Sequence, residues 1–185
     1  SATPKDDAVC HWEVMNANTA NYCSAVGYFF GRRLHEMIDV PIGLILANKG
    51  GTMVESWLNE DNLKCYTNAP VDSAEIAKRY PTDWLRPLLW GNGTFHPILN
   101  YSIRGIIYYQ GCSNVDHNPN TYAERLSRLI SQWRSDFKVP NLPFYFVEIA
   151  PYSYGNALDT AAASIRMQQQ TVAESVGNAV LIGTN

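Results

Sequence analysis

Residues 103–114 read IRGIIYYQGCSN, a short apolar run that passes into a polar turn. The part up to Gln110 is short and mostly apolar, which is typical of a strand covered on both faces. After the turn, apolar side chains recur at three- and four-residue steps from Tyr122 to Phe137, which predicts a helix with one buried face. A buried strand followed by an amphipathic helix is the unit from which parallel α/β sheets are built.

The same alternation extends to both sides of this stretch. The other predicted elements are helices within residues 19–39 and 159–176 and strands at residues 40–48, 142–150 and 178–185. Residues 59–88 contain several prolines and scattered charges, which predict loops and short helices. The sequence therefore predicts one α/β domain over residues 1–185, with a parallel sheet and with ligands at the carboxyl ends of its strands.

Composition and charge exclude several classes of partner. The chain has 185 residues, which fits one domain. No apolar run reaches the roughly 20 residues that span a membrane. The net charge is -3 without a stripe of Lys and Arg, so neither a nucleic acid nor a membrane is an expected partner. The four histidines and four cysteines lack the paired spacing of a metal site, so no metal and no cofactor are expected.

Loops at the ends of the predicted strands could carry chemistry; they are residues 48–57, 110–118 and 150–155. In the first loop Gly50 and Gly51 follow a strand directly, and paired glycines let backbone N–H groups approach a ligand, as an oxyanion hole requires. The alternative is an ordinary tight turn. In the second loop Gly111 and Asn114 form another turn, and the side-chain amide can donate to a developing oxyanion.

Two side chains of the second loop are candidate nucleophiles. Cys112 would have to be a thiolate, and His117 is the imidazole five residues further on. The alternative is an inert, partly buried cysteine. Ser113 lacks the flanking glycines of a Gly-x-Ser-x-Gly elbow, so a structural role is expected for its hydroxyl.

Several long segments follow one another in an order that a known family shares. Residues 23–57 read CSAVGYFFGRRLHEMIDVPIGLILANKGGTMVESW, and residues 92–114 read NGTFHPILNYSIRGIIYYQGCSN. The segments LISQWRSDF, LPFYFVEIAPY and IRMQQQ come later. Together they resemble the sialate O-acetylesterase family, a branch of the SGNH hydrolases that removes acetyl groups from sugars. The corresponding family motifs are an FSA-x-x-YFF helix, a VPIGLI strand, a GGT-x-x-ESW turn and I-x-G-x-x-WYQGESN, so the resemblance covers nearly the whole chain.

This resemblance implies a three-layer α/β/α, flavodoxin-like fold with a parallel sheet, as in the SGNH hydrolases. In that family a serine nucleophile follows the first strand in a Gly-Gln-Ser-Asn segment, and a histidine base follows the last strand in an Asp-x-x-His-Pro-like element. Neither segment occurs in the 185 residues. The domain is therefore expected to lack the first strand and the C-terminal catalytic segment, and the isolated chain is expected to be inactive.

The resemblance also assigns roles within the oxyanion loops. The backbone N–H of Gly51 and the side-chain amide of Asn114 would hold the oxyanion of the reaction. Gln110 and Gly111 would shape the same site. The attacking serine and the histidine base would not belong to these 185 residues.

Glu55 and Trp57 would bind substrate by forming the bottom of the site beneath it. Cys112 occupies the position at which the family has glutamate. The implied function is a serine esterase that removes O-acetyl groups from sugars, with sialic acid or an acetylated polysaccharide as substrate. The remaining part of the same enzyme is an expected partner, and the family points to a secreted, periplasmic or lysosomal protein. The alternative, favoured by the many aromatic residues and the absent serine and histidine segments, is a non-catalytic carbohydrate-binding α/β domain.

Overall fold

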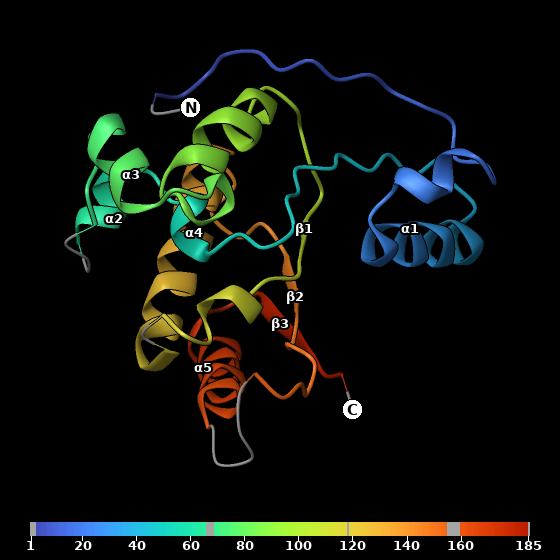
Figure 1. The fold of residues 1–185 in the computed structure, drawn as a ribbon. Coiled ribbons are helices and arrows are strands. Elements are labelled where there is room, and N and C mark those ends of the chain that lie inside the picture. The colour runs from blue at the N-terminus through green and yellow to red at the C-terminus, as the bar shows by residue number, and fades with distance from the viewer. Residues whose placement is uncertain (1–2, 66–68, 118, 155–159, 185) are drawn as a thin grey trace.

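The computed structural model describes residues 3–65, 69–117, 119–154 and 160–184 (Figure 1). Four residues at the bounds of predicted segments lie outside the described residues: Asn118, Gly155, Asp159 and Asn185. A body that carries the sheet is built from the described part of residues 49–184. A smaller N-terminal lobe, residues 17–48, lies to one side of the body (Figure 1).

Three of the predicted strands pair into one parallel sheet in the order β1-β2-β3. These strands are β1 (Ile106–Tyr108), β2 (Phe144–Val147) and β3 (Ala179–Ile182). In the register of the sheet Ile106 pairs with Phe144, and Phe146 pairs with Leu181. The three strand predictions are therefore confirmed, over shorter stretches than the apolar runs.

Two long helices pack together against one face of the sheet: α4 (Tyr122–Asp136) and α5 (Ala161–Ser175). On that face Phe144 and Phe146 are only 1% and 0% exposed. On the opposite face Tyr145, Val180 and Ile182 are 39%, 45% and 47% exposed. The α/β class with a parallel sheet is confirmed, and the described residues supply a full helical layer on one face only.

The N-terminal lobe contains the predicted first helix, α1 (Ala25–Ile38). The helix begins after Ser24, whose Oγ accepts the N–H of Gly27 at 3.4 Å. The strand predicted at residues 40–48 is wrong for the described chain, because this segment pairs with no strand. Its residue Leu44 packs against Gly31 of α1 instead. An apolar run can form a strand only where a neighbouring strand accepts its backbone hydrogen bonds.

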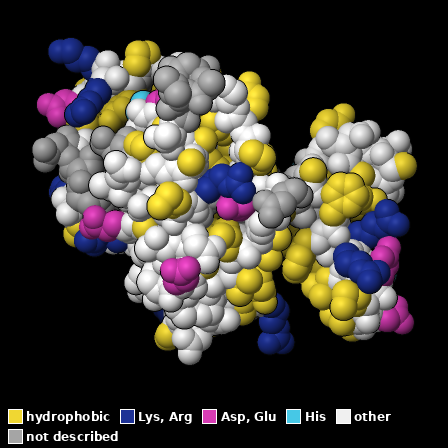
Figure 2. Space-filling model, turned by 90° about the horizontal axis from the view of Figure 1, so that it is seen from below, with side chains coloured by type: hydrophobic (Ala, Val, Ile, Leu, Met, Phe, Trp, Pro, Cys, Tyr) yellow, Lys and Arg dark blue, Asp and Glu magenta, His cyan; other side chains and the backbone are white. Residues whose placement is uncertain are grey.

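Several apolar side chains of the lobe are exposed. Phe29, Met37 and Leu46 are 64%, 67% and 43% exposed. On the body, β1 is an edge strand, since within the sheet it pairs with β2 alone. Figure 2 shows hydrophobic side chains on the facing sides of the lobe and the body. The described chain thus leaves apolar surface without a covering element there.

Residues 59–88 form short helices, as their prolines predict, and further short helices occur elsewhere in the described chain. The α-helices are α2 (Glu60–Lys64) and α3 (Ser73–Arg79), capped by Asn59 and Asp72. The remaining 3-10 or π turns are η1 (Thr19–Tyr22), η2 (Val54–Ser56), η3 (Asp83–Leu85), η4 (Gly91–Phe95), η5 (His96–Ile98), η6 (Cys112–Asn114) and η7 (Pro119–Thr121). None of the helices in the described ranges is long and apolar enough to cross a membrane.

Candidate active site

The Gly50–Gly51 turn lies on the surface of the body, directly before the buried segment that contains η2. Gly51 has a φ of 81°, a value that L side chains rarely adopt. A Cβ on Gly51 would also lie only 3.1 Å from Cδ1 of Trp84. Its backbone N–H donates to no acceptor among the described residues, so this N–H is available to a ligand.

The second turn, at Gly111, is more tightly packed. Gly111 has a φ of 137°, and a Cβ there would lie 2.8 Å from Cγ2 of Ile149 and 3.3 Å from Cγ2 of Ile165. Both contacts come from the core beneath the sheet end, so the neighbours cannot move away freely. Only glycine fits at this position, and the chain turns there from β1 into η6.

Two carboxamides join these turns. Nε2 of Gln110 donates to the carbonyl of Thr52 at 3.0 Å and to Oδ1 of Asn114 at 2.7 Å. The same Oδ1 accepts the N–H of Val54 at 3.0 Å. These bonds hold the loops at residues 48–57 and 110–118 side by side.

A buried ion pair extends this network towards α4. Nδ2 of Asn114 donates to Oε2 of Glu55 at 3.0 Å, and NH1 of Arg125 donates to Oε1 at 2.5 Å. The side chains of Arg125 and Glu55 are 5% and 10% exposed. Arg125 also donates to the carbonyl of His117 at 3.0 Å and to Oγ1 of Thr121 at 2.7 Å. The pair therefore fixes the turn after β1 onto α4 by charge-assisted hydrogen bonds.

Two further buried side chains complete the network. The hydroxyl of Tyr122 lies 2.9 Å from Oε1 of Gln110, and burial raises the pKa of this phenol, so it stays a hydrogen-bond donor. Gln169 accepts the N–H of Ile149 at 3.0 Å and donates to the carbonyl of Val147 at 3.2 Å. Gln169 thereby joins α5 to the end of β2.

Sequence reasoning did not assign Tyr122, Arg125 or Gln169 to the site. Tyr122 belongs to the apolar stripe of α4, and a phenol at the start of such a stripe carries a polar group into the core. Arg125 lies one turn later on the same helix. Gln169 lies in the IRMQQQ segment that matches the family. A polar side chain on a predicted buried face was the available signal for all three.

Asn114, whose side-chain amide is the predicted oxyanion donor, is buried in this network. Its Oδ1 accepts from Val54 and Gln110, and its Nδ2 donates one hydrogen bond to Glu55. An amide nitrogen carries two N–H groups, so the oxyanion role of Asn114 stays a prediction. The printed bonds show that Asn114 and Gln110 hold the two loops together.

Glu55 and Trp57, the residues predicted to bind substrate, are buried in the described chain. They are 7% and 5% exposed. The indole N–H of Trp57 donates to Oγ1 of Thr52 at 3.0 Å, and its ring meets the edge of Trp133 at 6.5 Å between centroids. Trp57 is therefore a core residue, and Glu55 is the charge partner of Arg125.

The candidate nucleophiles of the second loop lack a base in this structure. Cys112 is an exposed free thiol beside Tyr154, whose pKa is raised by burial and by its hydrogen bond with Cys112. Within the described ranges, no hydrogen bond joins Cys112 or Ser113 to His117. The described residues also contain no group of three or more His, Cys, Asp and Glu that could hold a metal ion.

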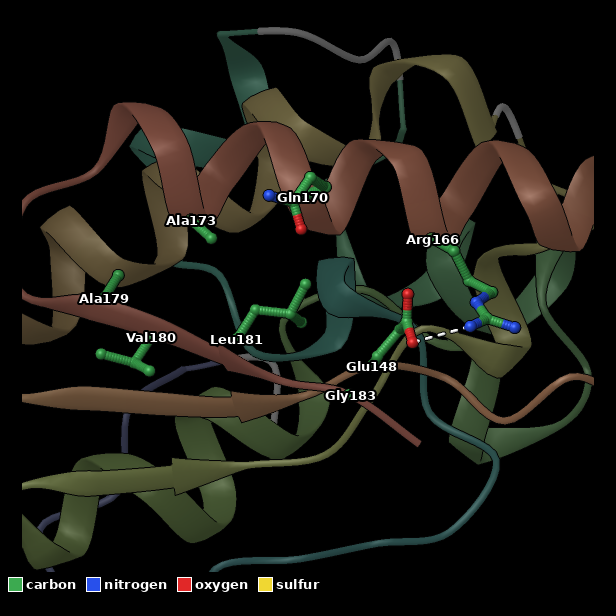
Figure 3. A pocket seen from close by; sticks show the side chains of 8 residues that line it. All are labelled: Glu148, Arg166, Gln170, Ala173, Ala179, Val180, Leu181 and Gly183. Carbon is green, nitrogen blue, oxygen red and sulfur yellow. Dashed lines mark hydrogen bonds and ion pairs between the residues drawn. The ribbon is translucent and has the colours of Figure 1, made fainter. Parts of the chain in front are cut away.

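A shallow pocket of about 600 Å³ lies away from these turns, between α5 and β3 (Figure 3). In Figure 3 Glu148 and Arg166 face each other at one end of this pocket, and Arg166 donates to the carboxylate at 2.8 Å. The described lining residues include none of the predicted site residues. The glycine turns, and not this pocket, therefore form the candidate site.

The described residues define an α/β protein with a parallel sheet, and comparison with known proteins identifies its family. The family described as carbohydrate esterase, sialic acid-specific acetylesterase, matches residues 10–185. The chain belongs to this family.

Individual relatives agree with this assignment. The human sialate O-acetylesterase is 34% identical over 121 residues, which are 63% of this chain and 22% of that protein. The mouse sialate O-acetylesterase is 29% identical over 180 residues, which are 80% of this chain and 33% of that protein. A carbohydrate acetylesterase from Xanthomonas citri superposes with a TM-score of 0.84 at 26% identity, over 99% of this chain and 40% of its own. The chain thus spans less than half of each of these proteins.

Proposed function

We propose that this chain forms the oxyanion-binding part of the active site of a serine esterase that removes O-acetyl groups from sugars. The observation that carries the proposal is the Gly51 turn, whose exposed N–H lacks an acceptor in the described chain. The network of Gln110, Asn114 and Glu55 locks this turn against the end of β1. A donor that is fixed before the reaction stabilises the transition state without a cost of reorganisation.

In the proposed reaction a serine hydroxyl attacks the acetyl carbonyl, and a histidine takes its proton. Water then hydrolyses the acetyl-enzyme and releases acetate. The N–H of Gly51 would bind the carbonyl oxygen as it becomes negative, and one such donor contributes about 3 to 4 kcal/mol. Asn114 and Gln110 would act through the position of the turn.

The serine and the histidine would come from polypeptide outside these 185 residues. No Gly-Gln-Ser-Asn segment occurs in the sequence. The open edge of β1 and the apolar surface beside the lobe support this part of the proposal, because a further strand there would pair with β1 and cover that surface. The names of the relatives support an acetylated sugar, such as a sialic acid or an acetylated polysaccharide, as substrate.

A serine-directed fluorophosphonate probe and an O-acetylated sugar test this proposal together. The 185-residue chain alone is expected to show neither labelling nor release of acetate, because it lacks the nucleophile. A longer protein that contains this chain and a Gly-Gln-Ser-Asn segment is expected to be labelled at that serine and to release acetate. Acetate release by the 185-residue chain that disappears in Cys112→Ala would overturn the proposal in favour of a cysteine hydrolase.

The second candidate, a non-catalytic carbohydrate-binding domain, is favoured by the exposed aromatic side chains. Trp84, Tyr109 and Tyr152 are 43%, 48% and 70% exposed on the body. Sugar binding without any acetate release by the longer protein would support this candidate over the esterase.

The uncovered apolar surface gives a further expectation for the isolated chain. It is expected to self-associate and to bind a hydrophobic dye, because the edge of β1 and residues such as Phe29 and Met37 are exposed. Sedimentation velocity over a range of concentrations measures the association. Replacing both Phe29 and Met37 by Lys should lower it, and a monomer that binds no dye at any concentration would contradict this expectation.

A further inference from the structure

An indole ring stands directly beside the candidate oxyanion donor. The Cβ position of Gly51 lies 3.1 Å from Cδ1 of Trp84 and 3.4 Å from Cγ, so the ring and the turn are in contact. Trp84 belongs to η3, one of the short helices that precede β1 in the sequence. With 43% of its surface exposed, the ring is in contact with both the turn and solvent.

The loop that carries Trp84 is anchored to the same segment that the buried network holds. Oγ of Ser56 donates to the carbonyl of Arg86 at 2.7 Å and lies 3.4 Å from the carbonyl of Trp84. The N–H of Leu88 donates to the carbonyl of Glu55 at 3.1 Å. Because Glu55 and Ser56 are buried, these bonds hold the backbone around Trp84 against the segment that follows Gly51.

A half-exposed indole beside an oxyanion donor suits one class of ligand in particular. A pyranose ring presents a face of C–H groups that packs on an aromatic face, while its hydroxyl groups stay at the edge and remain hydrated. A small acetyl ester has no pyranose ring to pack on an aromatic face, and only its carbonyl contacts the oxyanion donor. The ring therefore distinguishes a sugar ester from a small ester.

We propose that the indole of Trp84 stacks on the pyranose ring of an O-acetylated sugar. The stacked sugar is held so that its acetyl carbonyl reaches the N–H of Gly51. This inference rests on the proposed esterase function. Trp84 is the exposed indole that contacts the Gly51 turn; Trp12, which is 61% exposed, lies against Gly43 and Tyr101.

The first experiment measures binding to the 185-residue chain without any hydrolysis. An O-acetylated methyl glycoside is titrated into isotope-labelled protein, and the indole N–H resonances of the five tryptophans are followed. The Trp84 resonance is expected to shift. Trp84→Ala should weaken the apparent affinity about tenfold or more, Trp84→Phe should stay within about threefold of the wild type, and the matched variant Trp12→Ala should bind as the wild type does.

The second experiment separates this inference from the proposed function. In the longer, active protein Trp84→Ala is expected to lower kcat/KM for the acetylated glycoside at least about tenfold more than kcat/KM for 4-nitrophenyl acetate, with the loss for the glycoside mainly in KM. Three results would overturn the stacking role. They are unchanged glycoside binding in Trp84→Ala, no glycoside binding by the wild type, and an equal loss of glycoside affinity in Trp12→Ala. A longer protein that releases no acetate while Trp84 still binds the glycoside would instead refute the esterase and leave the stacking role standing.

Discussion

Glu55→Gln is expected to lower the free energy of unfolding by about 3 to 5 kcal/mol, because it leaves the buried Arg125 guanidinium without its counter-charge. Arg125 NH1 donates to Oε1 of Glu55 at 2.5 Å, and the arginine side chain is only 5% exposed. The carboxylate also accepts from Asn114 at 3.0 Å, so the turn after β1 loosens in the same variant. Urea denaturation followed by far-UV circular dichroism measures the change.

An exposed ion pair on the same helix provides the matched control. Arg128 donates to Glu124 at 2.9 Å, and these side chains are 34% and 48% exposed. Glu124→Gln should change the free energy of unfolding by less than about 0.5 kcal/mol, since solvent screens such pairs. The double variant Glu55→Gln with Arg125→Met should recover most of the loss. A loss in Glu55→Gln no larger than that in Glu124→Gln would show that the buried pair does not hold the two loops together.

Gly111→Ala is expected to cost about 2 to 5 kcal/mol of unfolding free energy, from the sum of backbone strain and overpacking. At a φ of 137° an alanine is strained whatever the space around it. Its Cβ would also lie 2.8 Å from Cγ2 of Ile149, a residue with no exposed surface. Because Gly111 joins β1 to η6, the longer protein should also lose acetyl-sugar hydrolysis in this variant. Thermal unfolding and acetate release measure the two effects.

Gly177→Ala is the control for this substitution. Gly177 has no heavy atom within 4 Å of its Cβ position. A methyl group there should leave the protein within about 0.5 kcal/mol of the wild type or stabilise it slightly, since alanine restricts the unfolded chain. Equal effects of the two glycine substitutions would mean that the close approach of Ile149 to Gly111 does not constrain the turn.

Much of the fold could be predicted because the signal is local. The strands at β1, β2 and β3 appear in the sequence as apolar runs, and α4 as an apolar stripe with helical spacing. The segment at residues 40–48 has an equally apolar run and yet forms no strand. The difference lies in its surroundings, since a strand needs a partner for its backbone groups and the described chain offers none there.

The family motifs predicted which loops form the candidate site, but not which of their side chains are buried. The loops that carry Gly51 and Gly111 lie side by side because Gln110 bonds to Thr52, although the apolar run before Gly50 forms no strand. The inward direction of Asn114 and Glu55 could not be predicted, because their carboxamide and carboxylate meet across 59 residues of sequence. In the sequence alone, a polar side chain beside a turn gives the same pattern whether it faces a ligand or the core.

The sequence by itself determined the parallel α/β class, the three paired strands and the family, because each of these follows from local periodicity or from ordered motifs. Only the tertiary structure decided that the loops of Gly51 and Gly111 lie side by side in a buried polar network, that the described residues leave one sheet face and the edge of β1 uncovered, and that Trp84 contacts Gly51. The physical reason is that burial and contact depend on which distant segments pack together. That arrangement is set by the whole core and is not encoded in any single stretch.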